Sequence, residues 1–268
     1  MLNVDFFDND KNNGWLIRQF EAYQFAGTSV TDKFIPRPYI SIVFHFRDCP
    51  LILDETPIQL APFFVGPIIP KTITLKFYGT MDTFVAHCKP TVFSRIFGLD
   101  LSPIPGRSIN LPQHHFLPLW EALADLRTTG ERIACFSAFV NSVQPTPYRL
   151  DAVDMLYDQI IERGITTLLK GLLADCPASK STLLRKFIKR TGVSPKTLMR
   201  VVRLDYLWTK IRDEKAIDYQ GLVFDGNYFD QSHFINDFRA IIGETPSYFF
   251  NRNLNVVKMF SGLPAGTL

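Results

Sequence analysis

The fold is decided by a stretch that occurs twice between residues 179 and 246. The first copy reads SKSTLLRKF at 179–187 and then GVSP at 192–195; the second reads DQSHFINDF at 230–238 and then GETP at 243–246. Corresponding positions are 51 residues apart throughout. Because a repeat of this length marks one structural unit used twice, it fixes the architecture of this part of the chain.

Each copy predicts a short helix followed by the start of another. Ser179 and Asp230 belong to the residue types that cap a helix by accepting a backbone N–H hydrogen bond. Apolar side chains then recur four residues apart, so one face of each helix is buried and the other is free. Gly192 and Gly243 suit the left-handed end of a helix, and a proline soon opens the next one.

A further helix and a turn are expected before each copy. Leucine-rich residues 166–174 and the turn at 176–178 precede the first, and residues 219–225 and the turn at 226–227 precede the second. Helix, tight turn and second helix with a free face form the helix-turn-helix pattern. A longer helix, about 196–212, has apolar residues at helical spacing and would span roughly 25 Å. Such a rod can set two reading helices near one DNA turn apart, on the order of 34 Å.

The composition is that of a folded protein with a sizeable core. The chain has 268 residues, 46% hydrophobic and 21% charged, which is ample for two domains. The net charge is only +3, but ten basic residues oppose one acid between residues 176 and 212, and the sign reverses over 213–230. Clustered positive charge indicates nucleic-acid binding. A solvated helix face is the alternative, and the coincidence with the repeated unit favours DNA.

The sequence also predicts where the protein resides. Its four cysteines have no metal-binding or redox spacing, which is typical of free thiols in a reducing compartment. The N-terminus lacks the basic and apolar regions of a signal peptide. No uninterrupted apolar run approaches the ~20 residues of a membrane span. We therefore expect a cytoplasmic, nucleoid-associated protein with no membrane partner.

The first 110 residues are predicted to be rich in β-strands. Alternating apolar residues indicate strands at 39–46 and 71–78, with a third candidate at 83–88 and a short helix at 91–97. Short strands separated by prolines suggest a small barrel or sandwich. The many phenylalanines of this half either line an apolar ligand pocket or pack into an aromatic core. Three amphipathic helices are expected between residues 113 and 164.

No pattern in the sequence supports catalysis or a metal site. His45 and His87 stand alone on their predicted strands, and no histidine pair has the spacing of a metal-binding barrel. The sequence contains no nucleophile elbow, P-loop, dinucleotide fingerprint or zinc-protease helix. We therefore expect a protein that is not an enzyme and that needs no cofactor or metal.

Two motifs occur in order along this part of the chain. The first is Leu183-x-Arg185-x-Phe187 with Gly192-Val193-Ser194-Pro195-Lys196, and the second is Tyr228 to Phe234 with Gly243 to Pro246. With these motifs the chain resembles the AraC/XylS family of bacterial transcription regulators. The resemblance covers roughly residues 150–252. It implies two helix-turn-helix units joined by a long helix, which insert their second helices into successive major grooves. It also implies an N-terminal β-domain of cupin-like type that senses a ligand or mediates dimerisation.

The expected organisation is an α+β protein of four segments. Residues 1–110 would form the β-barrel or sandwich sensor, 111–148 a helical connector with dimerisation helices, 149–253 the all-α tandem helix-turn-helix domain, and 254–268 a tail. The partners implied are double-stranded DNA and, as further options, RNA polymerase, a small-molecule effector and a second copy of the chain. A scaffold that binds protein instead of DNA, and a metal-dependent cupin fused to a DNA-binding half, are the alternatives.

Carried over by position, the resemblance assigns base contacts to Ser181, Thr182, Leu184, Arg185, Gln231, Ser232, His233 and Asn236. We expect further DNA contacts from Ser179, Lys180, Lys186, Lys189, Lys196 and Arg239. Arginine can bind guanine, and glutamine or asparagine can bind adenine, through paired hydrogen bonds. The lysines are expected at phosphates, which position the protein without specifying sequence. His233 has an alternative role in helix packing.

Two positions depart from the family pattern. Pro177 and Asn227 stand where the turns of the two units usually have glycine. Asparagine tolerates the left-handed conformation, whereas proline cannot adopt it. The first turn is therefore expected to close differently from the second.

Overall fold

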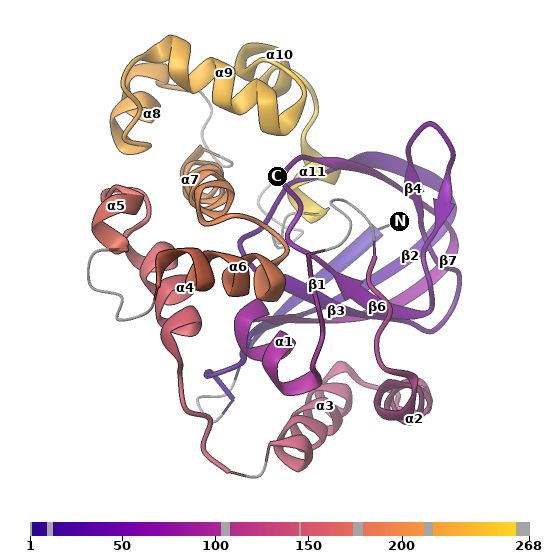
Figure 1. The fold of residues 1–268 in the computed structure, drawn as a ribbon. Coiled ribbons are helices and arrows are strands. Elements are labelled where there is room, and N and C mark those ends of the chain that lie inside the picture. The colour runs from indigo at the N-terminus through magenta and orange to yellow at the C-terminus, as the bar shows by residue number, and fades with distance from the viewer. Residues whose placement is uncertain are drawn as a thin grey trace.

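The computed structural model describes residues 2–9, 13–102, 108–144, 146–173, 179–211 and 217–260. The strands are β1 Leu2–Asp8, β2 Ile17–Phe34, β3 Ile40–His45, β4 Leu51–Leu53, β5 Ile58–Gln59, β6 Phe63–Gly66 and β7 Ile73–Cys88. The helices are α1 Pro90–Phe97, α2 Gln113–Ala124, α3 Thr129–Val143, α4 Ala152–Arg163, α5 Leu169–Leu172, α6 Lys180–Thr191, α7 Pro195–Ile211, α8 Tyr219–Asp225, α9 Gln231–Ile242, α10 Pro246–Phe250 and α11 Asn255–Phe260. A sheet followed by helices confirms the mixed α+β class (Figure 1).

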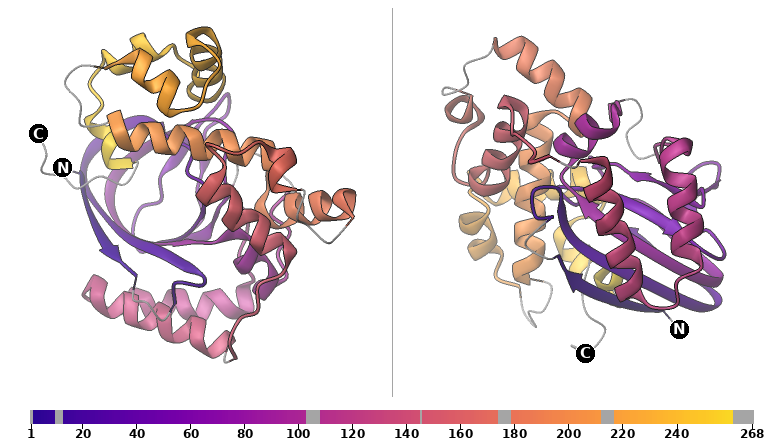
Figure 2. Two further views of the ribbon diagram at one scale, coloured as in Figure 1. Left: turned by 90° about the vertical axis from the view of Figure 1, so that its left-hand side faces the viewer. Right: turned by 90° about the horizontal axis from the view of Figure 1, so that it is seen from below.

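The strands form one antiparallel sheet in the order β1-β2-β7-β3-β6, with β4 paired to β7 and β5. Its longest strand pair is β2 with β7, which runs from Ile17 opposite Cys88 to Phe34 opposite Ile73 with register shifts between Ile17 and Gln19 and between Gly27 and Ser29. The sheet curls, as Figure 2 shows, but no described strand joins its edges β1 and β6. It is therefore an open sheet and not the closed barrel that short strands suggested.

A single strand, β7, replaces two predicted ones. It runs through Gly79, whose φ of +65° belongs to the left-handed region that glycine adopts readily. The Thr80 N–H donates to Asp48 Oδ2 at 2.8 Å just beyond this bend. Strands β1 and β2 were not predicted. In β2 the buried acid Glu21 interrupts the alternation of apolar residues, so the pattern that predicts a strand is broken there.

Aromatic side chains on one face of the sheet form a core with α2 and α3. The Phe136 ring of α3 lies 6.0–6.2 Å from the rings of Phe20, Phe44 and Phe84, which stand on three adjacent strands. Edge-to-face aromatic contacts of this kind stabilise a core beyond the area that they bury. The aromatic core that the sequence suggested is therefore present, and Phe64 on the opposite face lines a cavity.

The C-terminal half consists of two helical units on either side of α7. In Figure 1, α4 to α6 lie below α7 and α8 to α10 lie above it. The long helix predicted at about 196–212 is α7, a helix of 17 residues. Gly192 and Gly243 both have a φ of +81°, and Asn227 has a φ of +50°, as the capping and turn arguments required.

Two details of the first unit differ from the prediction. The helix predicted at 166–174 is the single turn α5, because Leu168 is its N-cap and 79% exposed. Ser179 stands at the N-cap of α6 but makes no capping hydrogen bond; its Oγ contacts the hydroxyl of Ser181 at 3.1 Å. The first turn, 176–178, and the first two acids after residue 212, Asp213 and Glu214, lie outside the described residues.

The apolar cores do not follow the two halves of the sequence. Leu183, Phe187 and Leu198 of the first unit belong to the same buried cluster as Phe84 and Phe136 of the sheet half. The second unit has a separate cluster, which includes Leu204, Trp208, Phe234, Phe238 and Phe249. The first unit is thus built onto the sheet half, whereas the second has a separate core, to which the sheet half contributes Ile35. Among the described helices, none could cross a membrane.

Candidate nucleic-acid interface

Helix α6 presents a polar face to solvent and buries the opposite one. Its buried side consists of Leu183, Phe187 and Thr191. The candidate contacts that are exposed on or just before this helix are Ser179, Lys180, Ser181, Arg185, Lys186 and Lys189. Thr182 and Leu184 are half-buried, and Leu184 packs partly against the core. The free face predicted for the first reading helix is therefore present, with Leu184 at its margin.

Helix α9 repeats this arrangement. Phe234, Phe238 and Ile241 are buried. The exposed candidate contacts are Gln231, Ser232, His233, Asn236 and Arg239. Asp230 caps the helix, because its Oδ1 accepts the His233 N–H at 2.7 Å. Both reading helices thus leave the predicted side chains accessible.

His233 makes contacts that fit the packing alternative. Its ring meets the Tyr228 ring edge-on, with centroids 5.1 Å apart. Its Nδ1 accepts the Phe229 N–H at 3.4 Å. These contacts orient the imidazole back toward the turn of the second unit. His233 therefore supports the turn geometry, although its side chain remains exposed.

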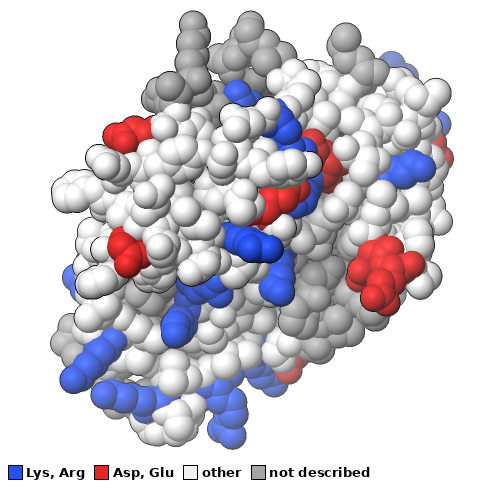
Figure 3. All heavy atoms as spheres, turned by 90° about the horizontal axis from the view of Figure 1, so that it is seen from above, with Lys and Arg blue, Asp and Glu red and all other residues white. Residues whose placement is uncertain are grey.

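The basic residues of the first unit and α7 divide into two groups. Arg190, Arg200 and Lys210 form ion pairs with Asp154, Asp237 and Asp225 respectively. The exposed candidates form no ion pair with any described residue: Lys180, Arg185, Lys186, Lys189 and Lys196. Figure 3 shows a face where Lys and Arg side chains gather in the lower part of the view and acids are few. Positive charge that no acid neutralises is available for phosphates.

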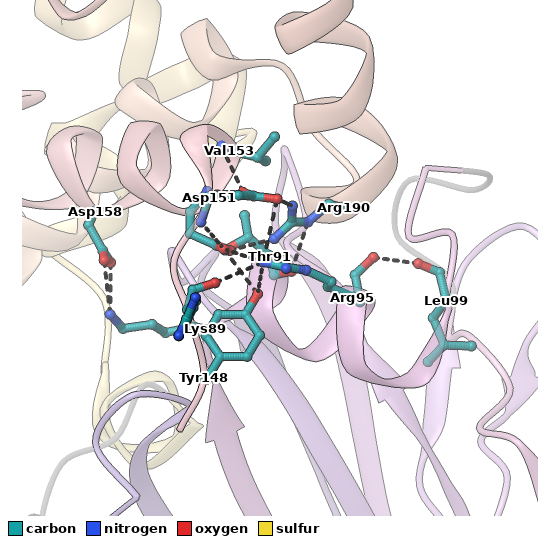
Figure 4. Close-up of polar contacts among 12 residues, drawn as sticks. Lys89, Thr91, Arg95, Leu99, Tyr148, Asp151, Val153, Asp158 and Arg190 are labelled. Atoms are coloured by element: carbon teal, nitrogen blue, oxygen red, sulfur yellow. Dashed lines mark hydrogen bonds and ion pairs between the residues drawn. The ribbon is translucent and has the colours of Figure 1, made fainter. Parts of the chain in front are cut away.

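Arg190 anchors the C-terminal end of α6 to the rest of the molecule. Figure 4 shows its guanidinium between α4 and α1. Its Nε donates to the Thr91 carbonyl at 2.8 Å, and its two terminal nitrogens contact Asp151 and Asp154. Asp154 is 1% exposed and also accepts a hydrogen bond from the Tyr148 hydroxyl at 3.0 Å. This network fixes the direction in which α6 leaves the protein.

A second network joins α7 to α9. Arg200 Nε donates to Asp237 Oδ1, and Asp237 Oδ2 accepts the Tyr228 hydroxyl at 3.1 Å. Burial, and then the Asp237 charge, raise the pKa of Tyr228, so its hydroxyl stays protonated and donates. Because Asp237 faces inward from α9, the opposite side of the helix is the one left for a partner.

Comparison with known families identifies the C-terminal part of the chain. Residues 173–252 match the model of a family described as a helix-turn-helix domain. These residues are an AraC-type helix-turn-helix domain. Within the AraC-type domain, the match includes both reading helices and the helix α7 that joins them.

Solved structures with a similar course of the chain were also found. ToxT from Vibrio cholerae is 12% identical, with 91% of this chain and 99% of that chain covered and a TM-score of 0.48. ToxT with a bound unsaturated fatty acid is 14% identical, with 98% and 96% covered and a TM-score of 0.45. The AraC-like transcriptional activator CuxR is 8% identical, with 77% and 87% covered and a TM-score of 0.28. Comparison with curated protein sequences found no significant match.

The sheet half, which precedes the AraC-type domain, contains a cavity of about 110 Å³. Its wall is mainly apolar and includes Val43, Ile52, Leu60, Phe64, Leu75, Phe77 and Val85. Polar side chains line one part of it: Arg37, Tyr39, Ser41, His45, Thr83 and His87. The sequence alone does not predict this site, because His45 and His87 share a face only once β3 pairs with β7. The alternation of side chains between the two faces of each strand was the sequence signal that could have placed both histidines on the same face of the sheet.

Two polar atoms at the cavity have no described partner. The Tyr39 hydroxyl and His45 Nε2 are buried without a hydrogen bond to any described residue. Burial lowers the pKa of His45 to about 3, so its imidazole is neutral at neutral pH. Burial also raises the pKa of Tyr39, which keeps its hydroxyl as a donor. A buried polar atom without a partner costs free energy that a bound polar group can recover.

The other ionisable side chains near the cavity lie close to one another in pairs. His87 Nε2 lies 2.9 Å from Glu21 Oε1, and Arg37 Nε lies 3.2 Å from Asp205 on α7. Burial alone would raise the pKa of Glu21, but His87 and Arg37 lower it to about 2. Among the described residues, no group of three or more His, Cys, Asp and Glu side chains is placed to hold a metal ion.

Proposed function

We propose that this protein is a transcription regulator that binds specific DNA sequences with α6 and α9 in successive major grooves. The observation that carries this proposal is the pair of repeated helices, each with a buried apolar face and an exposed polar one. Helix α7, at 17 residues and about 25 Å, spaces them on the scale of a DNA turn. The exposed lysines without ion pairs supply attraction to phosphates.

Arg185 and Lys189 are expected to play different parts on DNA. Arg185→Ala should cost about 1–3 kcal/mol of binding and relax specificity at one base pair, because arginine reads guanine through two hydrogen bonds. Lys189→Ala should weaken binding to all sequences alike and reduce the salt slope by about one, because it removes one phosphate contact. Titrations of DNA selected from a random pool, at several salt concentrations, measure both effects.

The two variants control for each other, since both residues are exposed on α6; Lys189 additionally lies near Asp100, whose pKa it helps to lower. Equal losses on every sequence from both variants would contradict the assigned roles. Failure of the unaltered protein to select any sequence would contradict DNA recognition itself.

We infer that the sheet half binds a small, mainly apolar molecule that carries a neutral polar group. A cavity of 150 Å³ lined by apolar side chains can hold benzene, and the present one is about 110 Å³. The Tyr39 hydroxyl and His45 Nε2 supply a donor and a neutral ring nitrogen for the polar group. Two carboxylates, Glu21 and Asp205, already lie near Arg37, so an additional anion would meet no unbalanced positive charge.

Three single-ring compounds and one linear carboxylate, decanoate, test this inference. At equal millimolar concentrations, phenol is expected to raise the melting temperature more than toluene or benzoate, and decanoate should have little effect. In Tyr39→Phe, which removes only one hydroxyl, the advantage of phenol over toluene should shrink. Stabilisation by decanoate alone, or an unchanged advantage in Tyr39→Phe, would contradict the assigned ligand class.

A further inference from the structure

The C-terminal end of α9 is attached to the sheet through backbone carbonyls. The Thr72 N–H donates to the Ile241 carbonyl at 2.9 Å, and the Thr72 hydroxyl donates to the Ile242 carbonyl at 3.1 Å. Lys33 Nζ donates to the same Ile242 carbonyl at 2.7 Å. Because the last carbonyls of a helix have no partner within it, these bonds satisfy groups that water would otherwise bind.

Ion pairs strengthen this attachment. Lys33 also pairs with Glu244, which directly follows the helix stop at Gly243. Arg252 donates to Asp32 at 2.8 Å and lies 3.5 Å from Glu244. The Lys33 and Glu244 side chains are each 20% exposed, so this pair is partly shielded from solvent. We call Asp32, Lys33, Thr72, Glu244 and Arg252 the docking contacts.

The first reading helix is attached to the same half of the molecule. The Leu101 N–H donates to the Lys189 carbonyl at 2.8 Å, and Arg190 donates to the Thr91 carbonyl. Thr72 immediately precedes β7, and Thr91 lies in α1, which begins two residues after β7 ends. One continuous strand therefore connects the points at which the two reading helices are fixed.

We propose that the sheet half acts as a frame that sets the separation of α6 and α9, so that it determines which spacing of DNA half-sites the protein accepts. The inference rests on the proposed DNA-binding function. Helix α7 joins the two units, because Leu198 packs in the first and Leu204 and Trp208 pack in the second. The attachments to the sheet half form a second connection beside α7, which further restrains the angle between α6 and α9. Lys33, Thr72 and Arg252 are then positioning residues, because they hold α9 in place without being part of it.

Binding to DNA with altered half-site spacing tests the frame. A site selected from random DNA would be rebuilt with one base pair inserted or removed between its half-sites. For the unaltered protein we expect affinity to fall about tenfold with each change, the scale of a lost base contact. In Lys33→Ala and Arg252→Ala the same change should cost less than about threefold, while affinity for a single half-site stays the same.

Two further variants keep the outcome interpretable. Lys210→Ala breaks an ion pair with Asp225 inside the C-terminal half, and it should keep the spacing preference of the unaltered protein. Thr72→Val removes one hydroxyl bond with little change in volume, so it reports on the frame even where an alanine variant folds poorly. Melting curves of all variants measure folding separately.

The outcomes separate the frame from DNA binding itself. Unchanged spacing preference in all three docking variants would overturn the frame and leave the DNA-binding function intact. Tighter binding to every DNA with unchanged spacing preference would overturn it as well, since the contacts would then restrain α9 from DNA. If the unaltered protein selected no sequence, the proposed function would fail together with the frame.

Discussion

Replacing Arg190 with methionine is expected to lower the free energy of unfolding by about 3–5 kcal/mol. The change keeps an unbranched apolar stem but removes the guanidinium, which leaves the buried carboxylate of Asp154 without its closest cation. Removing one partner of a buried ion pair is costly because the remaining charge stays desolvated. Urea denaturation monitored by circular dichroism measures the loss.

Arg185→Met is the matched control, because Arg185 lies five residues earlier on α6 and is exposed. It should change stability by less than about 0.5 kcal/mol. Replacing Arg190 and Asp154 together with methionine and leucine should recover much of the loss, since both charges are then absent. A small effect of Arg190→Met, comparable to that of the control, would show that the network of Figure 4 does not hold α6 in place.

Lowering the pH from 7.5 to 5 is expected to cost about 2 kcal/mol of stability through His45 alone. The folded protein keeps this imidazole neutral, with a pKa of about 3, whereas the unfolded chain protonates it near its ordinary value of 6.5. The unfolded state therefore binds more protons below pH 6.5, so stability falls as the pH decreases toward 3. Glu21, with a folded pKa of about 2 against an ordinary 4.5, adds a loss in the same direction below pH 4.5.

His45→Gln separates this contribution from those of other groups. Glutamine does not titrate, and its amide can still bond to Thr83, which lies 2.7 Å from His45 Nδ1. Denaturation curves at pH 7.5 and pH 5 should show a smaller difference for the variant, by about 2 kcal/mol. The same difference in both proteins would mean that His45 is protonated in the folded state and would remove it as a neutral cavity group.

The C-terminal architecture could be predicted because its signals are local. Helix caps, glycine stops and apolar residues four apart act within one or two turns of chain. Gly192, Gly243 and Asn227 have the left-handed conformations that their places in the repeat required. The family comparison over 173–252 confirms the assignment of the domain. The individual DNA contacts stay predictions, although most of their side chains are exposed.

The sheet half was predicted less well because its signals depend on partners far along the chain. Glu21 interrupts the apolar alternation of β2, and it is tolerated as a buried acid because His87 and Arg37 lower its pKa and because Gln19 and Tyr23 donate hydrogen bonds to it. Gly79 divides β7 in the sequence but not in the structure. The boundary near residue 149 stays a prediction, since the largest apolar cluster runs across it.

By itself, the sequence determined that the chain contains two copies of a capped helical unit joined by a long helix, because the free energy of caps and amphipathic faces is set by neighbouring residues. Only the tertiary structure decided that α6 and α9 are both fixed to the sheet half, that Arg190 is an anchor between α6, α4 and α1, and that His45 and Tyr39 face one cavity. These features arise from contacts between segments separated by up to 220 residues. No local pattern encodes such contacts, since they exist only where packing brings the segments together.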